Sequence, residues 1–149
     1  MPESLYLHST GLAVLDAQYD FIRARRAYLA GRIRGGLRVR RSRTGLRTLS
    51  SCASLAQGRS RLEVVPLHAI VGTLEPTTHF DSKFRPASNT VRFRWERIAL
   101  AHRKGQSLPP IVLRRQPDGY YVVDGRHRVS VARALGHRDI DAWVTGPRA

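Results

Sequence analysis

The sequence predicts an α/β or α+β domain. Between residues 62 and 149, short apolar runs typical of strands alternate with stretches whose apolar residues recur at the helical spacing of three and four. Turns that contain Gly or Pro separate these segments. The chain has 149 residues and is 42% hydrophobic, which is enough to bury one core. We therefore expect the order strand, helix, hairpin, helix, strand, with helices flanking a mixed sheet.

The charge of the chain divides it into two parts. Residues 1–61 contain twelve Arg and three acids, a net charge of +9, whereas residues 62–149 contain fourteen basic residues and eight acids, a net charge of +6. The first part is shorter, so its positive charge is much denser. We interpret residues 1–61 as a basic, largely helical N-terminal extension and residues 62–149 as the folded domain. A total of +15 favours a polyanionic partner.

The extension begins with a predicted helix. Asp16 and Asp20 lie early in it and the arginines lie late, an order that suits the helix dipole. Gly35-Gly36 is a natural stop, so the helix should span about residues 11–34. Residues 37–41 alternate like a short strand, and residues 44–56 fit a second short helix. The apolar positions with helical spacing are Leu12, Leu15, Tyr19, Ile22, Leu29 and Ile33.

The folded domain is predicted from strand and helix patterns in order. Residues 62–65 form a strand, and residues 70–73 extend it or begin a loop. Residues 74–88 contain two prolines and polar residues, which indicates a functional or exposed loop. The remaining predicted elements are a helix at 89–104, a strand at 111–114, a turn at 116–119, a strand at 120–123, a helix at 125–135 and a strand at 140–144.

The most informative feature is the turn between the predicted strand that ends at Asp124 and the predicted helix that follows Gly125. A helix that starts so abruptly presents free amide groups and the positive end of its dipole. Arg126, His127 and Arg128 add further donors at the same point. The arrangement favours an anion, above all a phosphate. The alternative is that Asp124 caps the helix and pairs with Arg126 or Arg128, so that nothing binds.

The segments 108–113, 119–128 and 132–136 resemble the N-terminal domain of ParB proteins and the sulfiredoxins, the ParB/sulfiredoxin-like superfamily. ParB proteins carry Gly-Glu-Arg-Arg at this turn, sulfiredoxins carry Gly-Cys-His-Arg, and free-serine kinases of this fold carry Asp-Gly-His-Thr-Arg. This chain has Asp-Gly-Arg-His-Arg at 124–128. Arg126 occupies the position of the sulfiredoxin cysteine, so reductase activity is not expected. Segments 80–86 and 94–99 also resemble an uncharacterised single-domain ParB-like branch, and the resemblance covers about residues 62–144.

The resemblance implies a nucleoside triphosphate, CTP or ATP, bound with Mg²⁺. By this analogy the phosphates would be held by the turn and by the start of the preceding helix, for which a plain capped helix is the alternative. The implied phosphate ligands are Gly125, Arg126, His127, Arg128, Thr90 and Arg92.

Acidic residues near the turn supply the candidate catalytic and metal-binding groups. By the same resemblance, Asp124 would hold the metal ion or serve as a base. Glu75 is the candidate second acid from the preceding loop, and its alternative is a solvated carboxylate. Asp81 has the same status.

The arginines of the extension form a run without an intervening acid, which can neutralise several phosphates of a DNA backbone. The alternatives are a solvated arm, a helix packed on its own domain, and contact with an anionic membrane surface. The candidate nucleic-acid ligands are Arg23, Arg25, Arg26, Arg32, Arg34, Arg38, Arg40, Arg41 and Arg43.

Three functions follow from these patterns. The first is a nucleotide-binding ParB-like module whose basic arm contacts DNA. The second is a phosphotransferase or nucleotide hydrolase, and the third is a nucleic-acid-binding protein without a nucleotide. The single cysteine, Cys52, excludes a disulfide framework within the chain. With no visible secretory signal and no apolar run of membrane-spanning length, we expect a cytoplasmic protein, with a homodimer as one candidate assembly.

Overall fold

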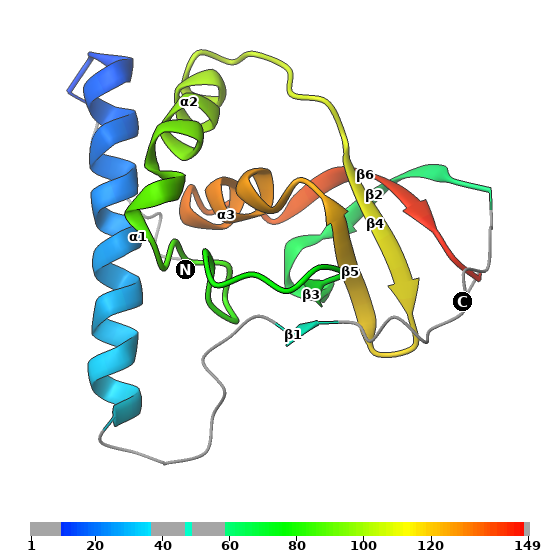
Figure 1. The fold of residues 1–149 in the computed structure, drawn as a ribbon. Coiled ribbons are helices and arrows are strands. Elements are labelled where there is room, and N and C mark those ends of the chain that lie inside the picture. The colour runs from blue at the N-terminus through cyan, green and yellow to red at the C-terminus, as the bar shows by residue number, and fades with distance from the viewer. Residues whose placement is uncertain (1–9, 37–46, 49–58, 148–149) are drawn as a thin grey trace, which may run out of the picture.

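The computed structural model describes residues 10–36, 47–48 and 59–147 (Figure 1). In this part of the chain, a six-stranded mixed sheet lies beside three helices, which confirms the predicted α/β class. The elements are α1 (Ala13–Gly36), β1 (Arg47–Thr48), β2 (Arg61–Pro66), the 3-10 turn η1 (Leu67–Ala69), β3 (Ile70–Thr73), the 3-10 turn η2 (Asn89–Val91), α2 (Arg92–Arg103), β4 (Ile111–Gln116), β5 (Gly119–Asp124), α3 (Arg126–Ala134) and β6 (Asp139–Thr145).

The strands are arranged in the order β1-β3-β5-β4-β6-β2. The β4–β5 hairpin is antiparallel, as its predicted turn at 116–119 requires, and β2 pairs antiparallel with β6. The pairs β3–β5 and β4–β6 are parallel. Residues 70–73 form a strand of their own rather than an extension of β2. The hairpin therefore lies in the middle of the sheet and places the end of β5 next to the start of α3.

The expected short helix at 44–56 is wrong at residues 47–48. Arg47 and Thr48 form β1, which pairs in parallel with Gly72 and Thr73 of β3. A side chain on Gly72 would collide with the backbone carbonyl of Arg47, so the missing Cβ lets the two strands approach. Residues 49–56 of that expected helix, and the expected strand at 37–41, lie outside the described residues.

The three helices pack in succession from the sheet outward, with α3 nearest the strands and α1 at the outer edge (Figure 1). Trp95 of α2 is fully buried between its neighbours. Its indole nitrogen donates to Ser130 Oγ of α3 at 2.8 Å, and its ring meets Phe21 of α1 edge to face at 5.5 Å. One side chain thus ties all three helices into one core.

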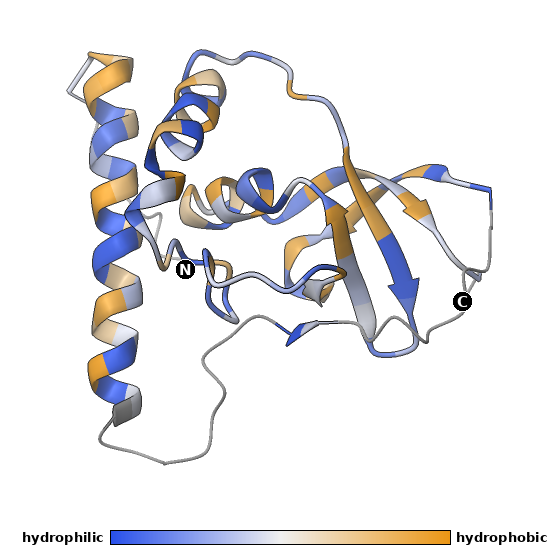
Figure 2. Cartoon of the chain, viewed as in Figure 1, coloured by the Kyte–Doolittle hydropathy of each residue, from blue (hydrophilic) through white to orange (hydrophobic). Residues whose placement is uncertain are grey.

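Helix α1 appears where the sequence predicts a helix, yet the face it packs on α2 is partly polar. The buried residues include Ala17 and Phe21, but also Asp16 and Asp20. Arg103 of α2 donates to both oxygens of Asp20, at 2.6 and 2.9 Å, and its Nη1 lies 3.7 Å from Asp16 Oδ2. Hydrophobic positions nevertheless recur along the whole helix (Figure 2), and many of them are exposed.

Among the described helices, none combines the length and the apolar character that crossing a bilayer requires.

Candidate functional site

The turn between β5 and α3 depends on Gly125. Its φ is +108°, in the left-handed region that a residue with a Cβ rarely adopts. A Cβ at this position would also collide with the side chain of Ile111, which is fully buried at the start of β4. Helix α3 begins directly afterwards, and no side chain caps its N-terminus. The amides of its first turn have no partner within the helix, as an anion site requires.

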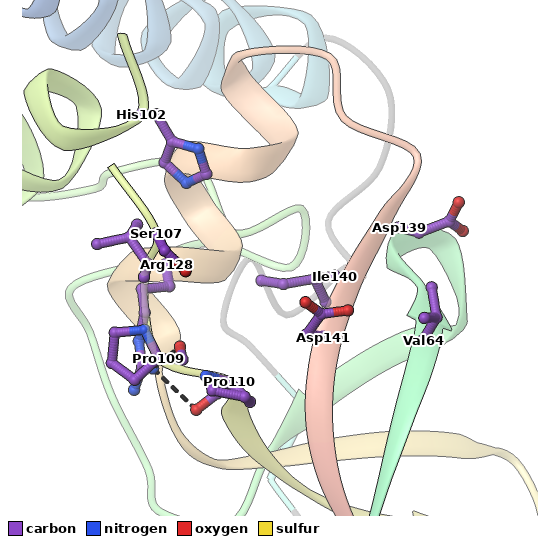
Figure 3. Close-up of a pocket in the computed structure, with 10 residues that line it drawn as sticks. Val64, His102, Ser107, Pro109, Pro110, Arg128, Asp139, Ile140 and Asp141 are labelled. Atoms are coloured by element: carbon purple, nitrogen blue, oxygen red, sulfur yellow. Dashed lines mark hydrogen bonds between the residues drawn. The ribbon is translucent and has the colours of Figure 1, made fainter. Parts of the chain in front are cut away.

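Arg128 is engaged in holding this turn together. Its Nη1 donates to the carbonyls of Pro109 and Pro110, at 2.5 and 2.9 Å, and its Nη2 donates to Asp124 Oδ2 at 2.7 Å. Figure 3 shows the guanidinium beside the two prolines. The predicted alternative, a pair between Asp124 and Arg128, is therefore present. Arg128 links the loop before β4 to the end of β5 and positions the start of α3.

His127 lies half-buried among positive charges. Its ring meets Phe80 edge to face at 5.2 Å. Burial, reinforced by the positive charges of Arg94, Arg126 and His79, lowers the pKa of His127 to about 4. Asp124 opposes this shift only weakly. At neutral pH the imidazole is therefore uncharged. Of the two arginines beside it, Arg126 lies 3.8 Å from the Glu75 carboxylate, whereas Arg94 has no ion pair among the described residues.

Thr90 belongs to the same region of the molecule. Its hydroxyl lies 3.2 Å from His79 Nδ1 and 2.8 Å from the hydroxyl of Ser88, which caps the turn η2 by accepting from the Thr90 amide. Arg92 takes another direction, because it pairs with Glu96 at 2.6 Å and lies over the Phe21 ring at 5.5 Å. Of the two residues predicted at this helix start, Thr90 lies near the cations and Arg92 is directed toward α1.

The three candidate acids do not come together as a metal site. Glu75 is 79% exposed, and its carboxylate lies 3.8 Å from the guanidinium of Arg126. Asp124 is largely exposed and is paired with Arg128. Asp81 is buried in an ion pair with Arg85. The described residues contain no group of three His, Cys, Asp or Glu side chains arranged to hold a metal ion.

Two hollows flank Arg128. The first is a groove of about 590 Å³ between α2 and the loop before β4, lined by Arg94, Arg97, Ile98, Leu100, Ala101, Lys104, Gln106, Leu108, Pro109 and Arg128. The second, a pocket of about 260 Å³ shown in Figure 3, lies between the same loop and β6, with His102, Ser107, Asp139 and Asp141 at its wall. The charged side chains of the first groove are all positive, so it suits an anionic ligand.

Sequence reasoning did not single out Arg94 as a site residue. It lies one helical turn after Thr90, and its charge acts on His127. The spacing of four residues from Thr90 was a usable signal, because positions i and i+4 of a helix lie on one face. His79 lies beside Thr90, with its Nδ1 3.2 Å from the Thr90 hydroxyl.

The arginines of the extension are unequally available. Arg23 pairs with Asp20 at 2.7 Å. Arg25 donates to Asn89 Oδ1 and to the Pro86 carbonyl, and it lies over the Tyr28 ring. Three others, Arg26, Arg32 and Arg34, are exposed. The remaining predicted ligands, Arg38, Arg40, Arg41 and Arg43, lie outside the described residues.

No protein-family model and no curated protein sequence matches this chain. Among solved structures, the chain is similar to sulfiredoxin from Arabidopsis thaliana, with 17% identity and a TM-score of 0.42. The match covers 58% of this chain and 86% of the sulfiredoxin chain. The likeness concerns the fold alone.

Proposed function

We propose that this protein binds the phosphates of a nucleoside triphosphate at the N-terminus of α3. The observation that carries the proposal is the pair of arginines beside His127, Arg94 and Arg126, at a helix start that no side chain caps. Positive side chains at a helix N-terminus oppose the helix dipole. A phosphate group relieves this repulsion and accepts hydrogen bonds from the free amides.

Each residue of the site has a distinct part in this proposal. Arg126 and Arg94 supply charge-assisted donors, and the hydroxyl of Thr90 supplies a neutral one. Gly125 supplies the left-handed turn that places the start of α3. Arg128 is a positioning residue, since its donors already hold Pro109, Pro110 and Asp124. The groove along α2 is the place for the nucleoside.

A Mg²⁺ ion fits this site only as part of the ligand. Two exposed carboxylates lie near the turn, and each already has an arginine partner: Asp124 accepts from Arg128, and Glu75 lies against Arg126. Mg²⁺ is commonly held by one or two carboxylates together with the phosphates of its ligand. Asp124 would then be the protein ligand of the ion, which would neutralise part of the phosphate charge.

Isothermal titration with CTP, ATP and GTP, each with and without Mg²⁺, tests the proposal. At least one of these nucleotides should bind, and the binding should weaken at high salt because salt screens exposed charges. The absence of binding by all three, under every condition, would overturn the proposed function.

Substitutions locate the binding. Arg94→Gln and Arg126→Gln should each weaken binding about tenfold, since losing a charge-assisted contact costs about 1.5 kcal/mol or more. Arg138→Gln is the matched control, because Arg138 is an exposed arginine beyond the opposite end of α3. An equal loss in the control would indicate that binding follows the net charge of the chain rather than the site.

The enzymatic and DNA-binding alternatives stay predictions. Asp124→Asn should abolish product formation if Asp124 acts as acid or base, and should weaken nucleotide binding only when Mg²⁺ is present. Deletion of residues 1–61 cannot test DNA contact cleanly, because α1 shares the core with α2. A combined substitution of the exposed Arg26, Arg32 and Arg34 by Gln tests it without removing buried residues.

A further inference from the structure

The face of α1 that points away from the domain carries a regular apolar seam. Its members follow each other at alternating intervals of three and four residues, which are the a and d positions of a seven-residue repeat. Five of its apolar members are between 41% and 70% exposed, and Ile22 is half-buried. The seam consists of Leu12, Tyr19, Arg26 and Ile33 at a, and Leu15, Ile22 and Leu29 at d.

The domain itself packs on the opposite side of the helix. Ala17, Ala24 and Gly31 recur every seven residues at position f, directly across the helix from a and d. Ala17 and Ala24 are buried, and a Cβ on Gly31 would collide with the guanidinium of Arg85. Arg85 donates to the Ala27 carbonyl at 2.9 Å and so approaches α1 closely. The small residues thus mark the face that packs on the domain, and the seam is left open.

The seam is as narrow as a helix-pairing surface. The positions that border it are Asp16, Arg23 and Ala30 on one side, and Gln18, Arg25 and Arg32 on the other. An apolar stripe restricted to a and d is the pattern of helices that pair, whereas a helix lying on a membrane or a core presents a wider apolar face.

The charge around the seam determines which helix fits it. Arg26 interrupts the seam at an a position, and Arg23, Arg25 and Arg32 border it. Of the carboxylates of α1, Asp16 borders the seam and Asp20 lies away from it, and each is 2% exposed and lies against Arg103 of α2. The exposed charges beside the seam are therefore positive. A second copy of this helix would therefore bring arginine against arginine in either orientation. A helix with acidic borders would bring the opposite charge.

We propose that α1 is a docking site for an amphipathic helix of another protein, one with apolar residues at its a and d positions and Glu or Asp beside them. The apolar residues would fill the seam on both sides of Arg26. A carboxylate of the partner would pair with Arg26 and fix the register, as a single polar a position does in coiled coils.

A pair of synthetic peptides tests this proposal. Both are as long as α1 and have Leu at a and d; one has Glu at e and g, and the other has Lys there. Fluorescence anisotropy with the full chain should show binding of the Glu peptide, and binding of the Lys peptide about tenfold weaker or undetectable. Equal affinities, or no binding of the Glu peptide, would overturn the proposal.

Variants of the chain assign the binding to the seam. The double variant Leu15→Ser, Leu29→Ser should bind the Glu peptide about tenfold more weakly or worse, because apolar anchors carry most of the binding energy of such contacts. Val14→Ser is the matched control, since Val14 is an exposed apolar residue of α1 outside the seam. Unfolding curves for both variants show whether the fold is intact.

Other occupants of the seam would be recognised by the same double variant. Sedimentation of the chain alone as a dimer, converted to a monomer by Leu15→Ser, Leu29→Ser, would assign the seam to a second copy. Binding to vesicles of anionic phospholipid that this variant abolishes would assign it to a membrane surface. Either result would contradict a helical protein partner.

Discussion

Helices α1 and α3 use their apolar residues in opposite ways. Helix α3 buries its apolar residues, Val129 and Val131 among them, in the core of the domain. Helix α1 buries two aspartates against Arg103 and leaves most of its leucines exposed. The comparison teaches that a periodic apolar pattern predicts a helix reliably, but it does not say whether the apolar face meets the same domain or a partner.

The two helices also differ in how their arginines are used. On α3, Arg128 holds two proline carbonyls, and Arg133 donates to the carbonyls of Leu67 and Ile70, at 2.6 and 2.8 Å. On α1, Arg26 and Arg32 remain exposed. A count of arginines near a turn therefore overestimates the ligands available to a phosphate, because backbone carbonyls compete for them.

The largest effect is expected for Trp95 of α2, whose side chain contacts both α1 and α3. Trp95→Ala should lower the free energy of unfolding by about 3–5 kcal/mol, since it removes a fully buried ring and leaves a cavity. Denaturant unfolding followed by circular dichroism measures the loss. Phe93→Ala is the control, because Phe93 is exposed on the same helix. A similar loss in both variants would contradict the central place of Trp95.

A somewhat smaller loss is expected at the polar contact of α1. Arg103→Met should cost about 3 kcal/mol, because it removes the cation that donates to both oxygens of the buried Asp20. Arg23→Met removes the exposed partner of the same Asp20 and should cost less than about 1 kcal/mol. If the two variants are equally stable, α1 is not anchored through its aspartates.

At α3, the turn residue should come next. Gly125→Ala should destabilise the protein by about 1–3 kcal/mol, since it forces a left-handed conformation on a residue with a Cβ and presses on Ile111. Thermal unfolding measures the change in stability, and nucleotide titration of the same variant measures the site. An Ala variant with unaltered stability would show that the turn tolerates a Cβ.

His127 should make stability depend on pH. Its folded pKa of about 4 lies below the ordinary value of 6.5. As pH falls from 6.5 toward 4, the unfolded chain takes up a proton that the folded chain rejects, so the free energy of unfolding decreases. His127→Gln should flatten that part of the profile. If the free energy of unfolding depends on pH in the same way in both proteins, the burial of a neutral His127 is contradicted.

The smallest effect is expected on the exposed seam of α1. Leu15→Ser, Leu29→Ser should change the free energy of unfolding by no more than about 0.5 kcal/mol per site, as exposed substitutions do. Chemical unfolding measures it. A loss of several kcal/mol would mean that the seam packs within the domain, and the contrast between α1 and α3 would disappear.

Much of the fold follows from the sequence, and the exceptions have physical causes. The hairpin turn at 116–119, the break at Gly125 and the strand that ends at Asp124 were predicted from local residue types alone. The two-residue strand β1 was not, because it exists only through its pairing with β3. For the site, Gly125 and His127 were predicted at the turn. The hydrogen bonds of Arg128 to Pro109 and Pro110 depend on tertiary packing, which no local pattern encodes.

The most direct test of the proposed phosphate site is the titration of His127 by NMR, with and without inorganic pyrophosphate. A bound anion would offset the positive charges of Arg94 and Arg126, so the pKa of His127 should rise from about 4 toward its ordinary value. His102 is an internal control, since its pKa is also lowered by burial but its charged neighbour is His137. A rise confined to His127 is the result we predict. An unchanged pKa of His127, or an equal rise at both histidines, would contradict a phosphate site at the start of α3.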